Sequence, residues 1–247
     1  MGKDYYRTQH GGLDAPARNH FFHGKLLDVF HLELETNYFN QKRWLLNRLV
    51  TGYGVVCGLD VKLTTDKKAI IVHPGVAVDR CGREIVVPQA TQPEALPGFP
   101  SYPDEEAEEQ SRCKEEYAYY VGLCYRECKS DPVPAMVSDC EVAMCAPGSI
   151  RETYEIKIKK GHIPEKKSTF PDVIEGQHIS YCAIVDQVTR PCRPLPMDCC
   201  IPLANILLRD SGTEWEPKID IYIRPIVYTN QLLYELILSL VREEEPQ

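Results

Sequence analysis

A long helical stretch that ends at a glycine and leads directly into short strands limits the possible folds of this chain more than any other segment. Asp28 suits the N-cap position, because its carboxylate can accept hydrogen bonds from the free amides of the first turn. Gly52 can adopt the left-handed conformation that ends a helix. The stretch between them predicts a helix of roughly 22 residues and about 33 Å.

Apolar residues recur along this stretch at helical spacing and define one wide face that we expect to be buried. They are Phe30, Leu34, Tyr38, Leu45 and Leu49. Within this face, Leu34, Tyr38 and Leu45 are predicted to be mostly buried, while Glu33 and Arg43 are predicted to stay exposed.

After the helix, the hydrophobic period changes from about 3.6 to 2. Strands are predicted at 55–63, 69–72, 76–78 and 83–87, separated by turn signals rich in Asp, Pro and Gly. Short strands joined in this way predict an antiparallel meander. Cys57 and Cys81 bracket the meander, and we expect them to lie close together, bonded or not.

Several segments of this region also carry a family resemblance. The segments FFHGKLL, NRLVTGYGVVCGLDV and IIVHPGVAVDRCGREIVV occur in this order, and ECKSDPVPAMVSDCEVAMC followed by SIRETYEI comes later in the chain. Together they resemble a family of proteins associated with phage-tail-like contractile injection systems. The resemblance implies a non-catalytic structural protein at or near the baseplate. Its expected partners are other particle subunits, including baseplate proteins, and copies of itself.

The whole chain of 247 residues is predicted to be an α+β protein with a mainly β, sandwich-like second domain. Changes in composition along the chain divide it into five segments. They are an extended arm at 1–20, the helix and meander at 21–88, a Pro-rich and acidic linker at 89–112, a β-rich domain at 113–229, and a C-terminal helix with its tail at 230–247. Within the β-rich domain we expect five or six strands, including 178–186 and 219–229, joined by Pro-rich and Cys-rich loops such as 129–140.

The predicted C-terminal helix is apolar around most of its circumference. Its polar stripe is narrow and consists of Gln231, Glu235, Ser239 and Arg242. A short helix of this kind must be covered by its own domain or by another chain.

Eleven cysteines leave three interpretations open. Cys124 and Cys182 lie within strand patterns, where a small buried hydrophobic residue is the simplest interpretation. For the loop cysteines, free thiols, disulfides and a structural zinc site all remain open. Their spacings lack the paired C-x2-C pattern of common zinc sites. The candidate metal ligands are Cys128, Cys140, Cys145, Cys192, Cys199 and Cys200.

Composition and motifs argue against several functional classes. A formal net charge of −8 and a pI near 5.4 disfavour nucleic-acid binding. No apolar run approaches the roughly 20 residues that a transmembrane helix needs. The N-terminus shows no signal peptide, so we expect a cytoplasmic protein or a particle assembled in the cytoplasm. A network of disulfides would instead require an oxidising compartment.

Sequence motifs for catalysis are absent, since the chain has no P-loop, no G-x-S-x-G and no H-E-x-x-H. His20, His23 and His31 cluster near the helix start, where we expect hydrogen-bonded packing or exposure in preference to metal binding. Together with the structural role that the resemblance implies, this predicts a non-catalytic protein without a cofactor, apart from the structural zinc left open above. A fibre adaptor or receptor-binding module is the alternative, and a Cys-dependent hydrolase is a further one.

Overall fold

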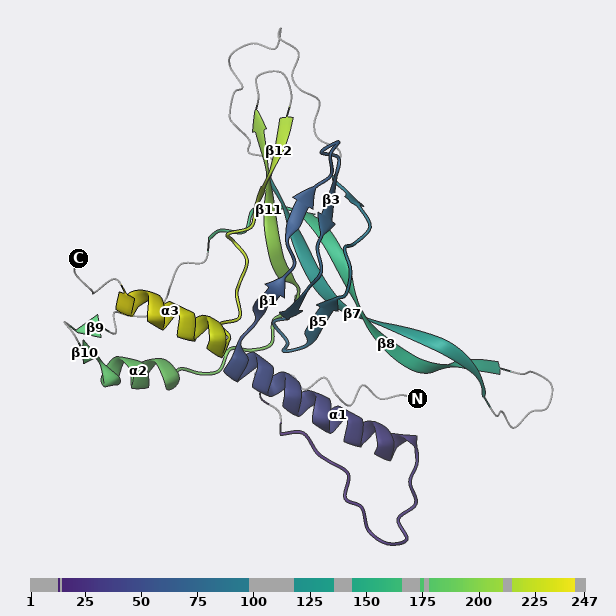
Figure 1. Ribbon diagram of the computed structural model, residues 1–247. Helices are drawn as coiled ribbons and strands as arrows, with labels where there is room; N and C mark the ends of the chain where they lie inside the picture. The colour runs from purple at the N-terminus through teal and green to yellow at the C-terminus, as the bar shows by residue number, and fades with distance from the viewer. Residues whose placement is uncertain are drawn as a thin grey trace.

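The chain folds as an α+β protein in which antiparallel sheets form the body and helices project from it (Figure 1). The predicted fold class is therefore confirmed. The computed structural model describes residues 13, 15–97, 118–135, 144–165, 174–175, 178–210 and 215–242. The helices are α1 (Val29–Leu46), the π-helical turn η1 (Asn47–Thr51), α2 (Tyr181–Val188) and α3 (Asn230–Arg242).

The first long helix begins and ends where the sequence predicts. Asp28 caps it, since its Oδ1 accepts from His31 N at 3.1 Å. Gly52 ends η1 with a φ of 85°, in the left-handed region.

The predicted burial of this helix is wrong. None of its residues is buried, and Leu34, Tyr38 and Leu45 are only half-buried. Glu33 and Arg43 are exposed, as predicted. Figure 1 shows the reason: α1 points away from the sheets, and only its C-terminal end reaches them.

The short strands after the helix form two three-stranded sheets. The strands are β1 (Gly54–Gly58), β2 (Val61–Leu63), β3 (Ala69–Val72), β4 (Gly75–Val78), β5 (Glu84–Val87) and β6 (Glu94–Ala95). Their orders are β1-β4-β5 and β2-β3-β6, with every strand pair antiparallel.

The simple meander predicted for these strands is therefore wrong. Leu59, fully buried with a φ of 56°, interrupts the single strand predicted at 55–63 and sends its two halves into different sheets. β6 adds a short strand at the start of the predicted linker, and residues 98–112 of that linker lie outside the described part.

A four-stranded antiparallel sheet completes the body. Its order is β12-β11-β7-β8, and its strands are β7 (Ala118–Ala135), β8 (Met144–Lys160), β11 (Ile201–Asp210) and β12 (Trp215–Asp220). One hydrophobic core joins this sheet to the two smaller ones. Its members include Leu59, Ile70 and Ile85 from the first part of the chain, and Leu123 and Leu203 from the second. The predicted boundary at 89–112 thus separates two stretches of sequence but not two hydrophobic cores.

Strands β7 and β8 continue past this sheet as a two-stranded ribbon that projects to the right in Figure 1. The loop predicted at 129–140 is therefore wrong up to Ala135. Pro132 pairs with Pro147, and Pro134 pairs with Cys145. A proline cannot donate within a sheet, but a ribbon without a third strand lets the missing N–H positions face outward.

Two more strand predictions are wrong in the second half. The stretch at 178–186 holds only the two-residue strand β10 (His178–Ile179), paired with β9 (Ile174–Glu175), and then becomes α2. The spacing of Tyr181, Ile184, Val185 and Val188 is helical, and this period prevails over the strand propensity of the single residues. In the stretch at 219–229, β12 ends at Asp220, and Ile226 forms only an isolated bridge to Val55.

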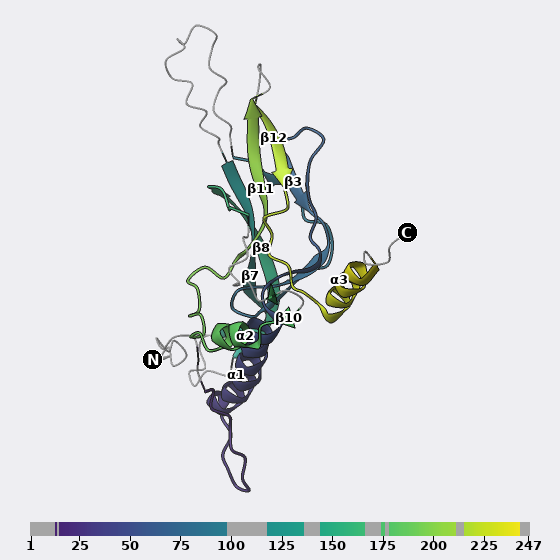
Figure 2. The ribbon, with the colours of Figure 1, turned by 90° about the vertical axis from the view of Figure 1, so that its left-hand side faces the viewer.

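The predicted C-terminal helix is confirmed as α3. Figure 2 shows α1 at one end of an elongated molecule and α2 and α3 on opposite sides of it. Residues 13 and 15–20 of the predicted arm lie outside helices and strands. Asn19 N nevertheless donates to Glu35 Oε2 of α1 at 3.1 Å, so this end of the arm lies against the helix.

Candidate functional site

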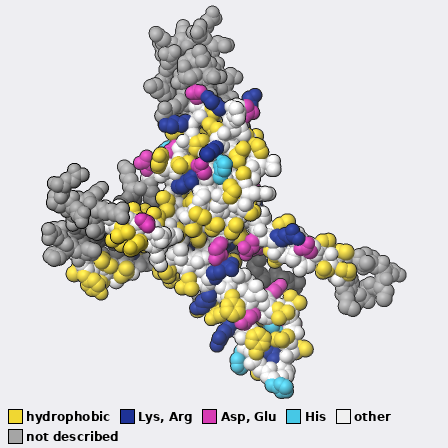
Figure 3. All heavy atoms as spheres, viewed as in Figure 1, with side chains coloured by type: hydrophobic (Ala, Val, Ile, Leu, Met, Phe, Trp, Pro, Cys, Tyr) yellow, Lys and Arg dark blue, Asp and Glu magenta, His cyan; other side chains and the backbone are white. Residues whose placement is uncertain are grey.

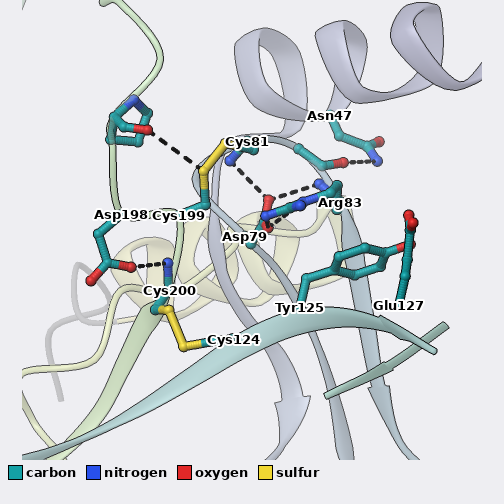
Figure 4. Close-up of polar contacts among 12 residues, drawn as sticks. Asn47, Asp79, Cys81, Arg83, Cys124, Tyr125, Glu127, Asp198, Cys199 and Cys200 are labelled. Atoms are coloured by element: carbon teal, nitrogen blue, oxygen red, sulfur yellow. Dashed lines mark hydrogen bonds and ion pairs between the residues drawn. A yellow bond between two sulfur atoms is a disulfide. The ribbon is translucent and has the colours of Figure 1, made fainter. Parts of the chain in front are cut away.

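The densest set of specific contacts lies where four parts of the chain meet: the end of the long helix, the β4–β5 turn, strand β7 and the loop before β11 (Figure 4). This junction contains the segment PGVAVDRCGREIVV, which carries part of the family resemblance.

Asp79 organises the β4–β5 turn and is fully buried. Its Oδ1 accepts from Cys81 N at 2.8 Å and from Arg83 N at 2.9 Å, and its Oδ2 accepts from Arg83 Nε at 2.8 Å. A buried carboxylate is stable only when it is paired and hydrogen-bonded, and this one has both. Asp79 therefore has a structural role in the turn. The D-x-x-G pattern between two apolar runs is the sequence signal that could have identified it.

Arg83 continues this network towards strand β7. Its guanidinium lies 4.5 Å from the centroid of the Tyr125 ring, a cation–π contact. The Tyr125 hydroxyl donates to Glu127 Oε1 at 3.0 Å. Burial, followed by this hydrogen bond, raises the pKa of Tyr125 well above its ordinary value, so the phenol stays protonated and remains a donor.

The same turn holds the C-terminal end of the long helix. Asn47 Nδ2 donates to Gly82 O at 2.9 Å and to Glu84 Oε1 at 2.8 Å. Gly82 has a φ of 90°, and a Cβ there would lie 2.0 Å from Trp44 O. Only glycine fits, so the turn residue also determines how closely the helix approaches the sheets.

Two disulfides crosslink the junction through adjacent cysteines. Cys199 bonds to Cys81 of the β4–β5 turn, and Cys200 bonds to Cys124 of β7. The start of β11 is thereby bonded to both parts of the chain. Cys57, expected to lie close to Cys81, forms no bond with it and is free.

The interpretation of two strand-pattern cysteines as buried hydrophobic residues is wrong. Cys124 is buried but forms a disulfide. Cys182 is an exposed free thiol in α2.

The five candidate metal ligands that the structure describes do not form one group. Cys199 and Cys200 are in disulfides, and Cys140 lies outside the described residues. Cys128, Cys145 and Cys192 are free and exposed. On the β7–β8 ribbon Cys128 lies opposite Arg151, and Cys145 lies opposite Pro134, several pairs further along. No group of three or more His, Cys, Asp or Glu side chains suited to a metal occurs within the described ranges.

The second resembling stretch forms a kink in the ribbon. Asp131 has a φ of 55° and lies beside Gly148, where a Cβ would meet Asp131 O at 2.7 Å. The Asp131 carboxylate accepts from the hydroxyls of Ser130 and Ser149 and from Arg151 at 3.1 Å. The hydrogen bonds from Ser149 and then Ser130 lower the pKa of Asp131. The segments around Asp131 and Ser149 thus form one hydrogen-bonded kink in the exposed β7–β8 ribbon.

The described histidines and free cysteines lie in separate parts of the structure. His31 completes the capping box at Asp28, while His20 and His23 are exposed. The free thiols of Cys57, Cys128, Cys145, Cys182 and Cys192 are exposed. Among the described residues, none of these thiols forms a hydrogen bond with a histidine of the kind that a nucleophilic pair requires.

Exposed hydrophobic side chains gather on the projecting helices and on the segment before α1 (Figure 3). Along α1 and the segment before it, the exposed large side chains include Phe21, Phe22, Leu26, Phe30 and Phe39. In α3, Leu233, Tyr234, Leu236 and Ile237 are exposed, while Leu232 and Leu238 are half-buried, so its own chain covers the described part of this helix only partly. Apolar surface gathered on projecting elements is typical of a protein that binds other chains.

A scan against protein-family models gives no match, and a search of curated proteins finds no relative for this sequence. Within the part of the chain that the structure describes, no helix has the length and apolar character needed to cross a membrane.

Proposed function

We propose that this protein is a non-catalytic structural subunit of a phage-tail-like contractile injection system, located at or near the baseplate. It acts through contacts with other particle subunits, including baseplate proteins. The resemblance of the helix, turn and ribbon segments supports this assignment. The roles of Asp79, Gly82 and Asp131 support it as well, since each of these motif residues shapes the backbone locally.

The observation that carries the proposal is the exposure of α1. An 18-residue helix has no buried residue, yet presents large apolar side chains along its length. Isolated helices of this length are marginal in water, and helices in proteins gain most of their stability from packing. A helix held out in this way is suited to be covered by another chain in an assembly.

The two disulfides indicate the kind of compartment in which the assembled particle acts. Disulfides are rare in cytoplasmic proteins and persist in oxidising surroundings. We infer that the subunit is assembled in the cytoplasm with reduced cysteines, and that after release of the particle dioxygen takes two electrons and two protons from each of the pairs Cys81–Cys199 and Cys124–Cys200. Thiol labelling of the subunit from intracellular and released particles distinguishes the two states.

The test of the structural role is a deletion of residues 230–247, which removes α3. Because most of the described side chains of α3 are exposed, the shortened protein should nearly keep its melting temperature but enter the particle poorly. Particle occupancy is measured in a host that lacks the native copy. Full occupancy of the shortened protein, or no association of the complete protein with any large particle, would contradict the proposal.

A second candidate, a fibre adaptor, is favoured by the projecting β7–β8 ribbon. Its outer part exposes Val133 and Ile150 and is free of the body. Replacing residues 127–152 by a short Asn-Gly turn should leave particle assembly intact if the protein is an adaptor, and should abolish fibre attachment. Loss of assembly instead would assign the ribbon to contacts inside the particle.

A further inference from the structure

Two segments of the body hold the C-terminal end of the long helix from outside it. One is the β4–β5 turn, where Gly82 O accepts from Asn47 Nδ2 at 2.9 Å. The other is the loop between α2 and β11, where Arg193 O accepts from Arg48 Nη1 at 3.3 Å. How firmly the projecting helix is held therefore depends on how firmly this turn and this loop are joined to each other.

The Cys81–Cys199 disulfide joins these two segments directly (Figure 4). Cys81 precedes Gly82 in the turn, and Cys199 lies six residues after Arg193 in the loop. A backbone hydrogen bond from Arg80 N to Cys199 O, 3.2 Å long, runs beside the crosslink. Opening the disulfide would leave this hydrogen bond to join the turn and the loop, so the helix end would be held less firmly.

The Cys124–Cys200 disulfide lies between two strands that are already paired. Leu123 of β7 and Ile201 of β11, the chain neighbours of the two cysteines, are partners in the antiparallel register, and the pairing continues along both strands. Opening this bond would leave the strand pairing in place. The two disulfides therefore fix different things, although their cysteines at 199 and 200 are adjacent.

The two disulfides also differ in how a thiol can reach them. Reduction begins when a thiolate attacks one sulfur and expels the other as a thiolate. Cys81 and Cys199 are both half-buried, so either sulfur can be attacked. Cys124 is only 4 % exposed, which blocks attack there. Attack on Cys200 would expel the Cys124 thiolate into the core, where desolvation disfavours a charge.

We propose that Cys81–Cys199 is a reversible thiol–disulfide exchange site that controls how firmly the long helix is held, while Cys124–Cys200 is a lasting structural crosslink. The reductant is a small dithiol or a pair of small thiols. It gives two electrons and two protons to the bond, is itself oxidised to a disulfide, and leaves Cys81 and Cys199 as free thiols. The site rests on the proposed function for its use and deepens it, because it regulates the helix that other subunits cover.

The first experiment measures which bond opens first in the folded, oxidised protein. Thiols outside the two disulfides are blocked with N-ethylmaleimide, and dithiothreitol is then added. Thiols that appear are trapped with isotopically labelled N-ethylmaleimide and identified by mass spectrometry. Cys81 and Cys199 should be released at least about tenfold faster than Cys124 and Cys200, because exchange requires access to the sulfur. Equal rates, or earlier release of Cys124, would overturn the assignment.

The second experiment measures hydrogen exchange of two matched double variants, each lacking one crosslink. In Cys81→Ser/Cys199→Ser, amides of residues 44–52 should exchange at least about tenfold faster than in wild type, while β7 and β11 keep their wild-type rates. In Cys124→Ser/Cys200→Ser, residues 44–52 should keep their wild-type rates. Unchanged exchange of residues 44–52 in the first variant, or an equal increase in β7 and β11, would overturn the control of the helix.

If either variant fails to fold, wild-type protein in which limited dithiothreitol has opened only Cys81–Cys199 is compared with the oxidised protein instead. Both experiments use the isolated protein, so they separate this site from the proposed function. If the bond opens and the helix end loosens as described, but the protein never joins a particle, the exchange site stands and the proposed function fails. If the protein joins the particle but both bonds open together, the structural role stands and the exchange site is refuted.

Discussion

Strand β11 and helix α1 are both rich in apolar residues, but they end in opposite environments. Ile201, Leu203 and Ile206 of β11 are fully buried between sheets. α1 has no buried residue and exposes Phe39 and Leu46. An apolar pattern therefore predicts a surface that requires covering, but does not say whether the same chain supplies the cover.

The two regions also differ in how they are held. The sheets share one core and two disulfides, while the C-terminal end of the helix joins them through contacts with Gly82 and Glu84. The stability of the isolated protein should therefore reside in the sheets, and the projecting helices should matter for assembly.

Reduction of the disulfides should have the strongest effect on stability. The two crosslinks close segments of 118 and 76 residues and should each stabilise the fold by about 2–4 kcal/mol. Reductant should therefore lower the free energy of unfolding by about 4–8 kcal/mol in urea titrations. Cys57→Ser, which removes an exposed free thiol, should change it by less than about 0.5 kcal/mol. Equal unfolding midpoints with and without reductant would mean that the crosslinks do not constrain the sheets.

Truncation of a core side chain contrasts the sheets with a projecting helix directly. Leu203→Ala should destabilise the protein by about 2–5 kcal/mol, because it leaves a cavity in the shared core. Ile237→Ala, on the exposed side of α3, should cost less than about 0.5 kcal/mol. Chemical denaturation of both variants measures the loss in free energy of unfolding. A comparable loss for Ile237→Ala would show that α3 belongs to the protein's own core.

The junction between the regions should respond less strongly. Asp79→Asn removes the charge that pairs with Arg83 and weakens three hydrogen bonds in a buried turn, so we expect a loss of about 2–4 kcal/mol. Asp131→Asn makes the same change at the exposed ribbon kink and should have a much smaller effect. Thermal unfolding of both variants ranks them, and the reverse order would refute the structural role given to Asp79.

A change of pH should affect stability least, through Asp198. Lys159, and then the Cys200 backbone N–H, lower the pKa of Asp198 below its ordinary value of 3.8. The folded state thus favours the ionised carboxylate, and the resulting stability is present above that ordinary value and is lost as the pH falls through the lowered pKa. The pair is largely exposed to solvent, so this contribution should stay below about 1 kcal/mol.

Asp198→Asn is the variant that tests this pH dependence. At about pH 7 the wild type should have a measurably higher unfolding free energy than the variant, and this difference should shrink at about pH 3. A difference that grows towards low pH would have the wrong sign.

Local sequence signals predicted local structure well in several places. The helix from Asp28 to Gly52 and the C-terminal helix α3 follow from capping residues and apolar spacing. The strand at 69–72 follows from a short apolar run between turn signals. Each of these depends on residues within a few positions of one another.

The wrongly predicted elements share a different property, because each depends on what lies next to it in space. The Pro-rich stretch at 129–135 is a strand because the ribbon has no third strand to require its amides. Cys199 and Cys200 are disulfide partners because folding brings Cys81 and Cys124 to them from far along the chain. No spacing along the sequence encodes either arrangement.

The α+β class, the ends of the long helix and the presence of two helices with apolar faces follow from the sequence alone, because hydrogen bonding and periodicity within a segment decide them. Tertiary packing was needed to establish that the sheets share one core, that Gly82 contacts the helix end, and that Phe39 and Leu46 of α1 stay exposed. The cause is that burial is a property of pairs of surfaces. A sequence shows that a surface is apolar, whereas the packing of distant segments determines which surfaces meet and which remain for a partner.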